Sequence, residues 1–343
     1  MPLRPSEGSA FPLWNDRSVA ACEEVLHHRM MPTYVPPEAA TRLIRDYGLT
    51  MTAANFWSGA SVSDHAMKPA PTVAEFEARR REYPAELRLY NWTADEIFNA
   101  PELTEPLHRW SRNMHRAGIE SMLVAPPTPE LFDDGTRTGR TAVDIWPIQY
   151  LYYTMSPGNV ENAVKKGMEV WTYTALNQEG HAPKWLLDFA PVNYRVLPGF
   201  LNQSMGFPGI LYWCIDHWQA GADPWRGAPF HSEGGATFPG EGVLVYPGRG
   251  AGVPGVVPLM RLNWIRDGLE DYEYVALLKK AGQTNDALKI ARGVAADFKS
   301  WSQRPADYDE AHRRIGEILS GAHRLPRPYV NRGQGMSHFR GQK

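Results

Sequence analysis

The sequence has few of the features that mark metal-binding or disulfide-bonded proteins. Its two cysteines, Cys22 and Cys214, lie far apart and show no metal-ligand spacing, so we expect both to be buried thiols. The histidines, including His27 and His28, show no spacing of the metalloprotease type. We therefore predict neither a metal site nor a cofactor.

The chain also lacks a strong charge bias and a long apolar run. A formal net charge of -2 gives no basis for binding nucleic acid or a membrane surface. No apolar run approaches the roughly 18 residues that a membrane-spanning helix needs. The first 14 residues contain no apolar signal core. We expect no nucleic-acid or membrane partner, and both a cytoplasmic location and secretion or periplasmic export after removal of a signal stay open.

Proline and tryptophan, by contrast, are abundant. The 29 prolines exceed the usual ~5% of residues and suggest long structured loops. The 12 tryptophans suggest flat apolar platforms of the kind on which sugars stack, although a tryptophan-rich core would explain several of them. The length of 343 residues fits one barrel of about 250 residues with extensions.

Residues 87–99, LRLYNWTADEIFN, are the most informative stretch. Residues 87–92 alternate in a run with few helix formers, which predicts a short strand followed by Asp95 and Glu96. Neighbouring strand residues point to opposite faces, so both acids can serve one cavity only if the backbone leaves the pleat there. This happens at the carboxyl ends of (β/α)8 barrel strands, where such enzymes keep their chemistry. Alternatively, the acids begin the next helix, near the positive end of its dipole.

Strand and helix patterns alternate along most of the chain, which predicts an α/β fold with a TIM-like parallel (β/α)8 barrel. The predicted strands are residues 11–14, 30–35, 49–56, 87–92, 120–125, 142–148, 168–175 and 209–215. The predicted helices between them are residues 16–28, 37–47, 72–83 and 103–118. The first strand is very short, and the segment before the last strand is irregular and rich in proline.

A C-terminal helical extension follows the predicted barrel. Residues 219–255 form a Gly- and Pro-rich loop with one embedded arm at 242–248, and a loop of that length is usually functional. The amphipathic helix predicted over 258–280 is expected to pack on the outside of the barrel, followed by helices over 285–301 and 308–319. We expect one domain over residues 1–320 and a mobile tail over 321–343.

Six sequence blocks carry a resemblance to a known family. They are VDIWP (143–147), EVWTYT (169–174), NYRVLP with Arg195, GILYWCIDHW (209–218), the GVLVYPG arm and IRDGLEDYEYVALL (265–278). With the acid pair, the chain resembles glycoside hydrolase family 123, the β-N-acetylgalactosaminidases, over roughly residues 87–280. The family fold is a (β/α)8 barrel, often preceded by a β-rich domain, and this chain is similar to the catalytic barrel alone. It departs from the family at Ile97, where similar proteins often have proline.

The resemblance implies a retaining exo-β-N-acetylgalactosaminidase acting on glycans that end in β-linked N-acetylgalactosamine (GalNAc). In substrate-assisted catalysis the 2-acetamido oxygen of the sugar attacks the anomeric carbon and forms an oxazoline. Glu96 would serve as general acid and then base, and Asp95 would orient the acetamido group and stabilise its positive charge. A β-N-acetylglucosaminidase with the same mechanism is one alternative. A catalytically silent carbohydrate-binding barrel is another.

Further candidate residues come from other predicted strand ends. Tyr173 would donate its hydroxyl to the acetamido oxygen, unless it is a core tyrosine, and Trp171 shares its face by period-two spacing. Trp146 and Trp213 are candidates for the apolar floor under the sugar, with a structural role as the alternative for either. The candidates for hydrogen bonds to sugar hydroxyls are Asp216, His217, Trp218 and Asn55. Asp144 is as well explained by a structural role.

Overall fold

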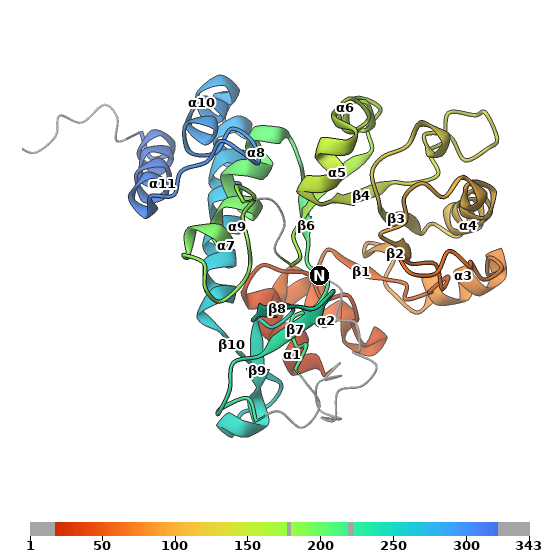
Figure 1. Cartoon of the computed structure of the whole chain (residues 1–343), viewed down its shortest axis with the longest axis horizontal. Coiled ribbons are helices and arrows are strands. Elements are labelled where there is room, and N and C mark those ends of the chain that lie inside the picture. Colours follow the sequence, from red (N-terminus) through yellow and green to blue (C-terminus); the bar gives the residue numbers. More distant parts are fainter. Residues whose placement is uncertain (1–17, 177–179, 219–222, 322–343) are drawn as a thin grey trace, which may run out of the picture.

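The structure, a computed structural model, describes residues 18–176, 180–218 and 223–321 (Figure 1). Three predicted features lie outside these residues: the strand over 11–14, the start of the helix over 16–28, and the tail from residue 322. The helices that match prediction closely are α1 (Val19–His27), α2 (Pro37–Tyr47), α3 (Val73–Arg81), α4 (Thr104–Arg116) and α9 (Met260–Lys280). The capping box between Thr72 and Glu75 at the start of α3 is confirmed.

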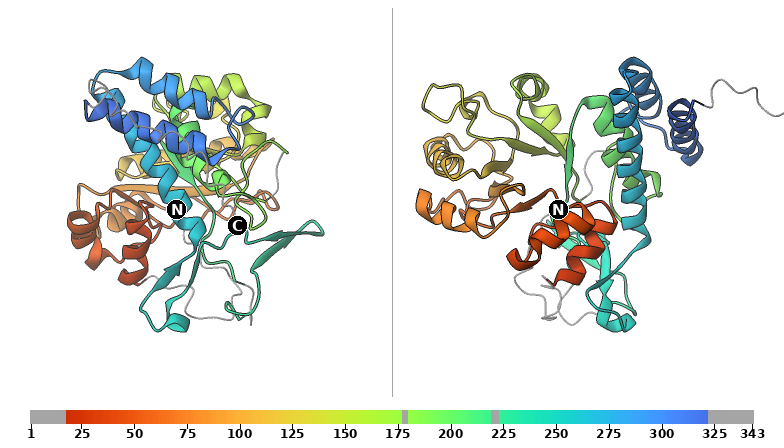
Figure 2. Two further views of the ribbon diagram at one scale, coloured as in Figure 1. Left: turned by 90° about the vertical axis from the view of Figure 1, so that its left-hand side faces the viewer. Right: turned by 180° about the vertical axis from the view of Figure 1, so that it is seen from behind.

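A curled sheet of six parallel strands forms the centre of the fold, with helices around its outer side (Figures 1 and 2). The strands follow in chain order: β1 (Met51–Ala53), β2 (Arg88–Asp95), β3 (Glu120–Val124), β4 (Ile145–Ile148), β5 (Glu169–Tyr173) and β6 (Gly209–Leu211). The short elements between them are η1 (Pro101–Leu103), η2 (Pro129–Leu131), α5 (Tyr150–Met155), α6 (Pro157–Lys165), α7 (Val192–Val196), η3 (Leu197–Leu201) and α8 (Asn202–Met205). Strand–helix alternation along one parallel sheet makes this an α/β fold.

Within the described part of the chain the sheet is a half-barrel, not the eight-stranded barrel expected from the sequence. Residues 30–35 form no strand, although the Thr33 carbonyl accepts hydrogen bonds from the Ala53 amide at 3.0 Å and the Thr52 hydroxyl at 2.9 Å. Pro32 lacks the N–H that a continued ladder would need, which explains why this segment lies along β1 without joining the sheet as a strand.

The extension after β6 consists of two antiparallel ribbons and a group of helices. One ribbon pairs β7 (Phe230–Glu233) with β8 (Ala236–Pro239), and was not predicted. The other pairs β9 (Val245–Pro247), in the predicted arm, with β10 (Val256–Pro258), with η4 (Gly248–Ala251) between them. The last helices are α10 (Thr284–Val294) and α11 (Pro305–Leu319). The prediction that α10 continues to residue 301 was wrong, because the extended residue Ala295 pairs with Trp301.

The long helix α9 packs closely on α7 and η3, on the outer side of the sheet as predicted (Figure 1). Gly268 makes this approach possible, because a Cβ atom there would collide with the backbone carbonyl of Arg195. The Arg195 guanidinium donates to the carboxylate of Asp271 at 2.6 and 3.1 Å, and Asp271 is fully buried. Two of the sequence blocks that carry the family resemblance therefore meet at a structural contact of the scaffold.

The buried ion pair gives a stability prediction with a matched control. Asp271→Asn should lower the free energy of unfolding by about 3 kcal/mol, because removal of one partner leaves a poorly compensated buried charge. The control is Asp309→Asn, since Asp309 contacts the same guanidinium at 2.6 Å but its side chain is 71% exposed. The control should cost at most about 1 kcal/mol. Urea unfolding of both variants measures the difference, and equal losses would contradict the prediction.

Candidate functional site

A β-bulge in β2 decides where the acid pair points. Trp92 lies opposite Met122 in β3, and Asp95 lies opposite Val124, with one more residue on the β2 side. Side chains alternate along a strand, so a regular β2 would place Asp95 on the face opposite to Trp92. The extra residue at Thr93 shifts the alternation by one and returns Asp95 to the face of Trp92.

Glu96 reaches the same cavity because the chain leaves the pleat there. β2 ends at Asp95, and Glu96 has a φ of 53°, in the left-handed region that non-glycine residues seldom adopt. Gln149 directly follows β4, and its side-chain amide Nε2 donates to Glu96 Oε1 at 2.6 Å. The acid pair thus lies at the carboxyl end of a strand, as predicted, and its two side chains line one cavity.

This cavity has a volume of about 180 Å³ and is lined by Trp92, Asp95, Glu96, Tyr173, Ala175, Leu176, Trp213, His231 and Glu233. The residues come from the carboxyl ends of β2, β5 and β6 and from the β7–β8 ribbon. It combines carboxyl groups with aromatic surfaces, an arrangement suited to a small polar ligand with one apolar face.

Tyr173 closes one side of the cavity at the end of β5. Its ring is buried, and this burial, with the negative charges of Asp95 and Glu96, raises the pKa of its phenol well above the ordinary value of 10.0. Burial and the same two acids also raise the pKa of Tyr152 in α5. Both phenols therefore keep their protons at neutral pH, and Tyr173, which lines the cavity, can donate a hydrogen bond into it.

Trp213 forms another wall, just beyond β6. Its indole Nε1 donates to Oε1 of Glu241 at 2.6 Å. His217 and His231 pack against the indole, with ring centroids 4.8 and 5.5 Å away, and His217 thereby touches the cavity wall without lining the cavity. Of the residues predicted to surround the acids, Tyr173 and Trp213 line the cavity.

Two predicted tryptophans lie elsewhere. Trp171 shares the face of Tyr173, as expected, but it lies nearer the amino end of β5. There the centroid of its ring is 6.3 Å from that of the Tyr90 ring. There it lines a separate cavity of about 730 Å³ toward the amino ends of the strands. Trp146 lies opposite Val170, on the other face of the sheet, and is fully buried with its Nε1 3.4 Å from Met168 Sδ. Neither ring is among the residues that line the cavity at the acid pair.

The remaining predicted residues also lie outside the cavity. Trp218 is buried and donates to the Val245 carbonyl at 3.1 Å. Asp216 is buried beside Cys214, and burial raises its pKa to about 7. Asn55 is exposed and turns its amide back to the Ala53 carbonyl at 2.9 Å. Their positions follow from local backbone contacts and not from proximity to the acid pair.

Several residues around the site were not expected from the sequence. They are Trp92, Gln149, Tyr152, Leu176, His231, Glu233 and Glu241. Gln149 had a usable signal, because it directly follows a predicted strand and the carboxyl ends of parallel strands meet at one edge. His231 and Glu233 had only a weak signal, because they lie in the long Gly- and Pro-rich loop expected over residues 219–255, and a loop of that length is usually functional.

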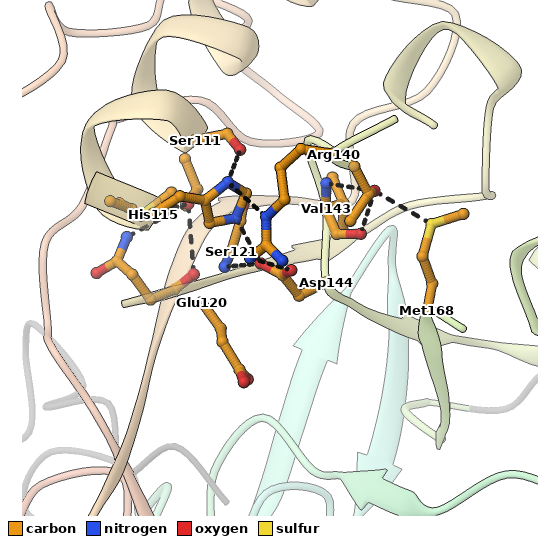
Figure 3. A network of polar contacts seen from close by, with 12 residues as sticks. Ser111, His115, Glu120, Ser121, Arg140, Val143, Asp144 and Met168 are labelled. Atoms are coloured by element: carbon orange, nitrogen blue, oxygen red, sulfur yellow. Dashed lines mark hydrogen bonds and ion pairs between the residues drawn. The ribbon is translucent and has the colours of Figure 1, made fainter. Parts of the chain in front are cut away.

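A second polar network lies near the start of β4 (Figure 3). Asp144 accepts from His115 Nε2 at 2.7 Å and from the Ser121 amide at 2.8 Å, and Arg140 contacts its other oxygen at 3.0 Å. Ser111 Oγ lies 3.3 Å from His115 Nδ1, which resembles a Ser-His-Asp series. Ser111 is fully buried, however, so no substrate can reach it, and Asp144 has the structural role.

The described residues contain no group of three or more His, Cys, Asp or Glu side chains that could hold a metal ion. Within the same part of the chain, no helix is both long and apolar enough to span a membrane.

Together, a parallel α/β half-barrel and a carboxyl pair at a strand's carboxyl end are typical of enzymes with chemistry at this edge of the sheet. Residues 135–278 match the family model described as glycoside hydrolase 123, catalytic domain. The resemblance predicted from the sequence is thereby confirmed over these residues. The match contains Tyr173, Trp213 and Glu241 and begins after the acid pair. No match is found among curated proteins. The family match indicates a glycoside hydrolase whose substrate is a glycan.

Proposed function

We propose that this protein is a retaining exo-β-N-acetylgalactosaminidase that works by substrate-assisted catalysis. The observation that carries the proposal is the placement of two sequence-adjacent carboxyl groups, Asp95 and Glu96, on one cavity by the bulge and the left-handed residue. An ordinary retaining enzyme uses two separately placed carboxyls about 5–5.5 Å apart, one of them the nucleophile. Adjacent acids instead suit a reaction in which the substrate supplies its own nucleophile.

In the first step, the acetamido oxygen of the bound sugar attacks the anomeric carbon, and the bond to the glycosidic oxygen breaks. Glu96 gives its proton to that oxygen as it leaves. Because Glu96 Oε1 accepts a hydrogen bond from the Gln149 amide, the proton sits on Oε2. Asp95 accepts the acetamido N–H and stabilises the positive charge that develops on the group.

In the second step, water opens the oxazolinium ion, which has kept the N–H proton that Asp95 accepts. Glu96, now ionised, takes a proton from the water while the water oxygen bonds to the anomeric carbon and the acetamido oxygen departs. Two successive inversions give net retention. The Tyr173 phenol supports both steps by donating to the acetamido oxygen, and the face of the Trp213 indole provides the apolar floor.

The small cavity supports an exo-acting enzyme that holds a single terminal ring. We further propose that the half-barrel is part of a (β/α)8 catalytic domain that includes α9 to α11. In that arrangement residues 30–35, which already contact β1, take a barrel position beside it. The natural substrates would be glycans or glycoconjugates that end in β-linked GalNAc.

Chromogenic p-nitrophenyl glycosides test the proposal. The β-GalNAc substrate should be hydrolysed, and β-galactoside should react at least about 10³-fold more slowly, because a well-oriented neighbouring group reaches effective molarities of about 10⁵ M or more. A preference for the β-N-acetylglucosamine (β-GlcNAc) substrate would mean that the enzyme acts on that sugar by the same mechanism. Comparable rates for galactoside and GalNAc would contradict it and make Glu233, a further cavity carboxyl, the candidate nucleophile. Absence of hydrolysis with all three would favour a carbohydrate-binding barrel.

A further inference from the structure

A buried carboxyl group lies directly behind the cavity wall. Glu241 follows β8 and is fully buried. Its Oε1 accepts from Trp213 Nε1 at 2.6 Å, and its Oε2 accepts from the backbone N–H of Leu176 at 3.1 Å. Glu241 itself does not line the cavity, so it would act through these neighbours.

The neighbours of Glu241 belong to different parts of the site. Trp213 follows β6, and Leu176 lies three residues beyond the end of β5 with a φ of 56°. Both line the cavity that contains the acid pair. One carboxyl group therefore joins the ends of two strands that form adjacent walls.

The backbone next to Glu241 leaves the indole little freedom. Gly242 has a φ of 71°, and a Cβ atom there would lie 2.5 Å from the Trp213 ring. The Gly242 amide donates to the Tyr212 hydroxyl at 2.8 Å. From the other side, Arg261 in α9 donates to the carbonyls of Gly240 and Val243, which flank this turn. The backbone groups on both sides of Glu241 are thus fixed by hydrogen bonds.

We propose that Glu241 is a positioning residue that fixes the Trp213 indole and the Leu176 turn in the geometry needed to bind the sugar ring. The inference rests on the proposed function for its consequence in catalysis. The hydrogen bonds that Glu241 accepts from Trp213 and Leu176 can be tested without any substrate.

The charge of Glu241 should decide whether all of these hydrogen bonds exist. The groups that face it are Arg261 from α9, Tyr194 from α7, Tyr173 from β5 and Tyr212 beyond β6. Burial outweighs the hydrogen bonds and the positive charge of Arg261, and raises the pKa of Glu241 to about 7. The ionised carboxylate accepts on both oxygens. In the protonated form one oxygen carries a proton that faces an N–H donor, so one hydrogen bond is lost.

Nuclear magnetic resonance of protein labelled with ¹⁵N-tryptophan tests the contact directly. Trp213→Phe assigns the Trp213 indole N–H resonance by its absence. In the unmodified protein this resonance should lie downfield at pH 8.5, because the acceptor of the hydrogen bond is charged. As the pH is lowered it should move upfield, with a midpoint near pH 7. A Trp213 indole resonance that has the same position at pH 8.5 in the unmodified protein and in Glu241→Gln would overturn the inference.

Two variants identify the group that titrates. Glu241→Gln should abolish the transition near pH 7, and Asp216→Asn, which removes another buried carboxyl with a raised pKa, should keep it. His217 contacts the same indole, and burial lowers its pKa, so a transition from His217 should lie at lower pH and remain in both variants. A transition that survives Glu241→Gln and disappears in Asp216→Asn would overturn the inference.

The kinetic consequence is measured with the β-GalNAc substrate. Glu241→Gln should lower kcat/KM by about 10²-fold, since a displacement of about 1 Å can cost that much. In the unmodified enzyme kcat/KM should fall as the pH drops below 7, because Glu241 then gains a proton. The variant should lack this fall. An unchanged kcat/KM in Glu241→Gln would overturn the positioning role. If the unmodified protein hydrolyses none of the acetamido glycosides, the proposed function fails, and the indole titration still decides on the contact.

Discussion

Glu96→Gln should slow hydrolysis of a β-GalNAc substrate with a poor leaving group by about 10²–10⁴-fold, the usual contribution of general acid catalysis. A p-nitrophenyl substrate should lose far less in the first step, because its phenolate leaves without protonation. Glutamine keeps an oxygen for the Gln149 amide that now contacts Glu96 Oε1, so the change removes the proton with little change in shape. Measuring kcat/KM for both substrates with the unmodified enzyme and the variant gives the result.

The matched control for this experiment is Glu233→Gln. Glu233 lines the same cavity, but it lies on the β7–β8 ribbon, its side chain is 60% exposed, and it contacts His231 at 3.3 Å. Its loss of charge should not produce a strong dependence on the leaving group. If the dependence belongs to Glu233→Gln and not to Glu96→Gln, the proton donor has been assigned to the wrong carboxyl.

Asp95→Asn should fail in a different way, with a loss of about 10²–10³-fold for every leaving group. The acetamide is the attacking group in every case, and the variant lacks the negative charge that orients it and stabilises the oxazolinium-like transition state. A thiazoline that mimics the intermediate should also bind the variant much more weakly than the unmodified enzyme. The measurements are kcat/KM with both substrates and the inhibition constant of the thiazoline.

Asp144→Asn serves as the control for Asp95→Asn, since Asp144 belongs to the separate network around His115 and Arg140 (Figure 3). It should leave thiazoline binding unchanged. The assignment of roles would be reversed if Asp95→Asn showed the dependence on leaving group. If both Asp95→Asn and Glu96→Gln kept nearly full activity, the acid pair would not be the catalytic centre.

The family-specific sequence blocks divide between scaffold and site. Arg195 and Asp271 form a buried ion pair between α7 and α9, away from the cavity that holds the acids. Tyr173 and Trp213 lie in blocks that end at the cavity. A sequence resemblance thus reports on both packing and chemistry, and the structure is needed to separate the two.

The residue pattern by itself determined much of the architecture. The alternation of strand and helix, the cap formed by Thr72 and Glu75, the position of Asp95 and Glu96 at a strand end and the course of α9 were all predictable. These features depend on hydrogen bonds and side-chain periodicity within a few residues, so the local sequence contains the necessary information.

Tertiary structure decided which side chains share the cavity. The register between β2 and β3 places the extra residue at Thr93, and this sets the direction of Asp95. Strand register likewise buries Trp146 on the opposite face, and a ribbon more than 50 residues beyond β5 brings His231 to the rim. Glu241 is placed by donors from two strand ends. Such contacts join residues far apart in the chain, and their geometry depends on how separate elements pack, which no local pattern encodes.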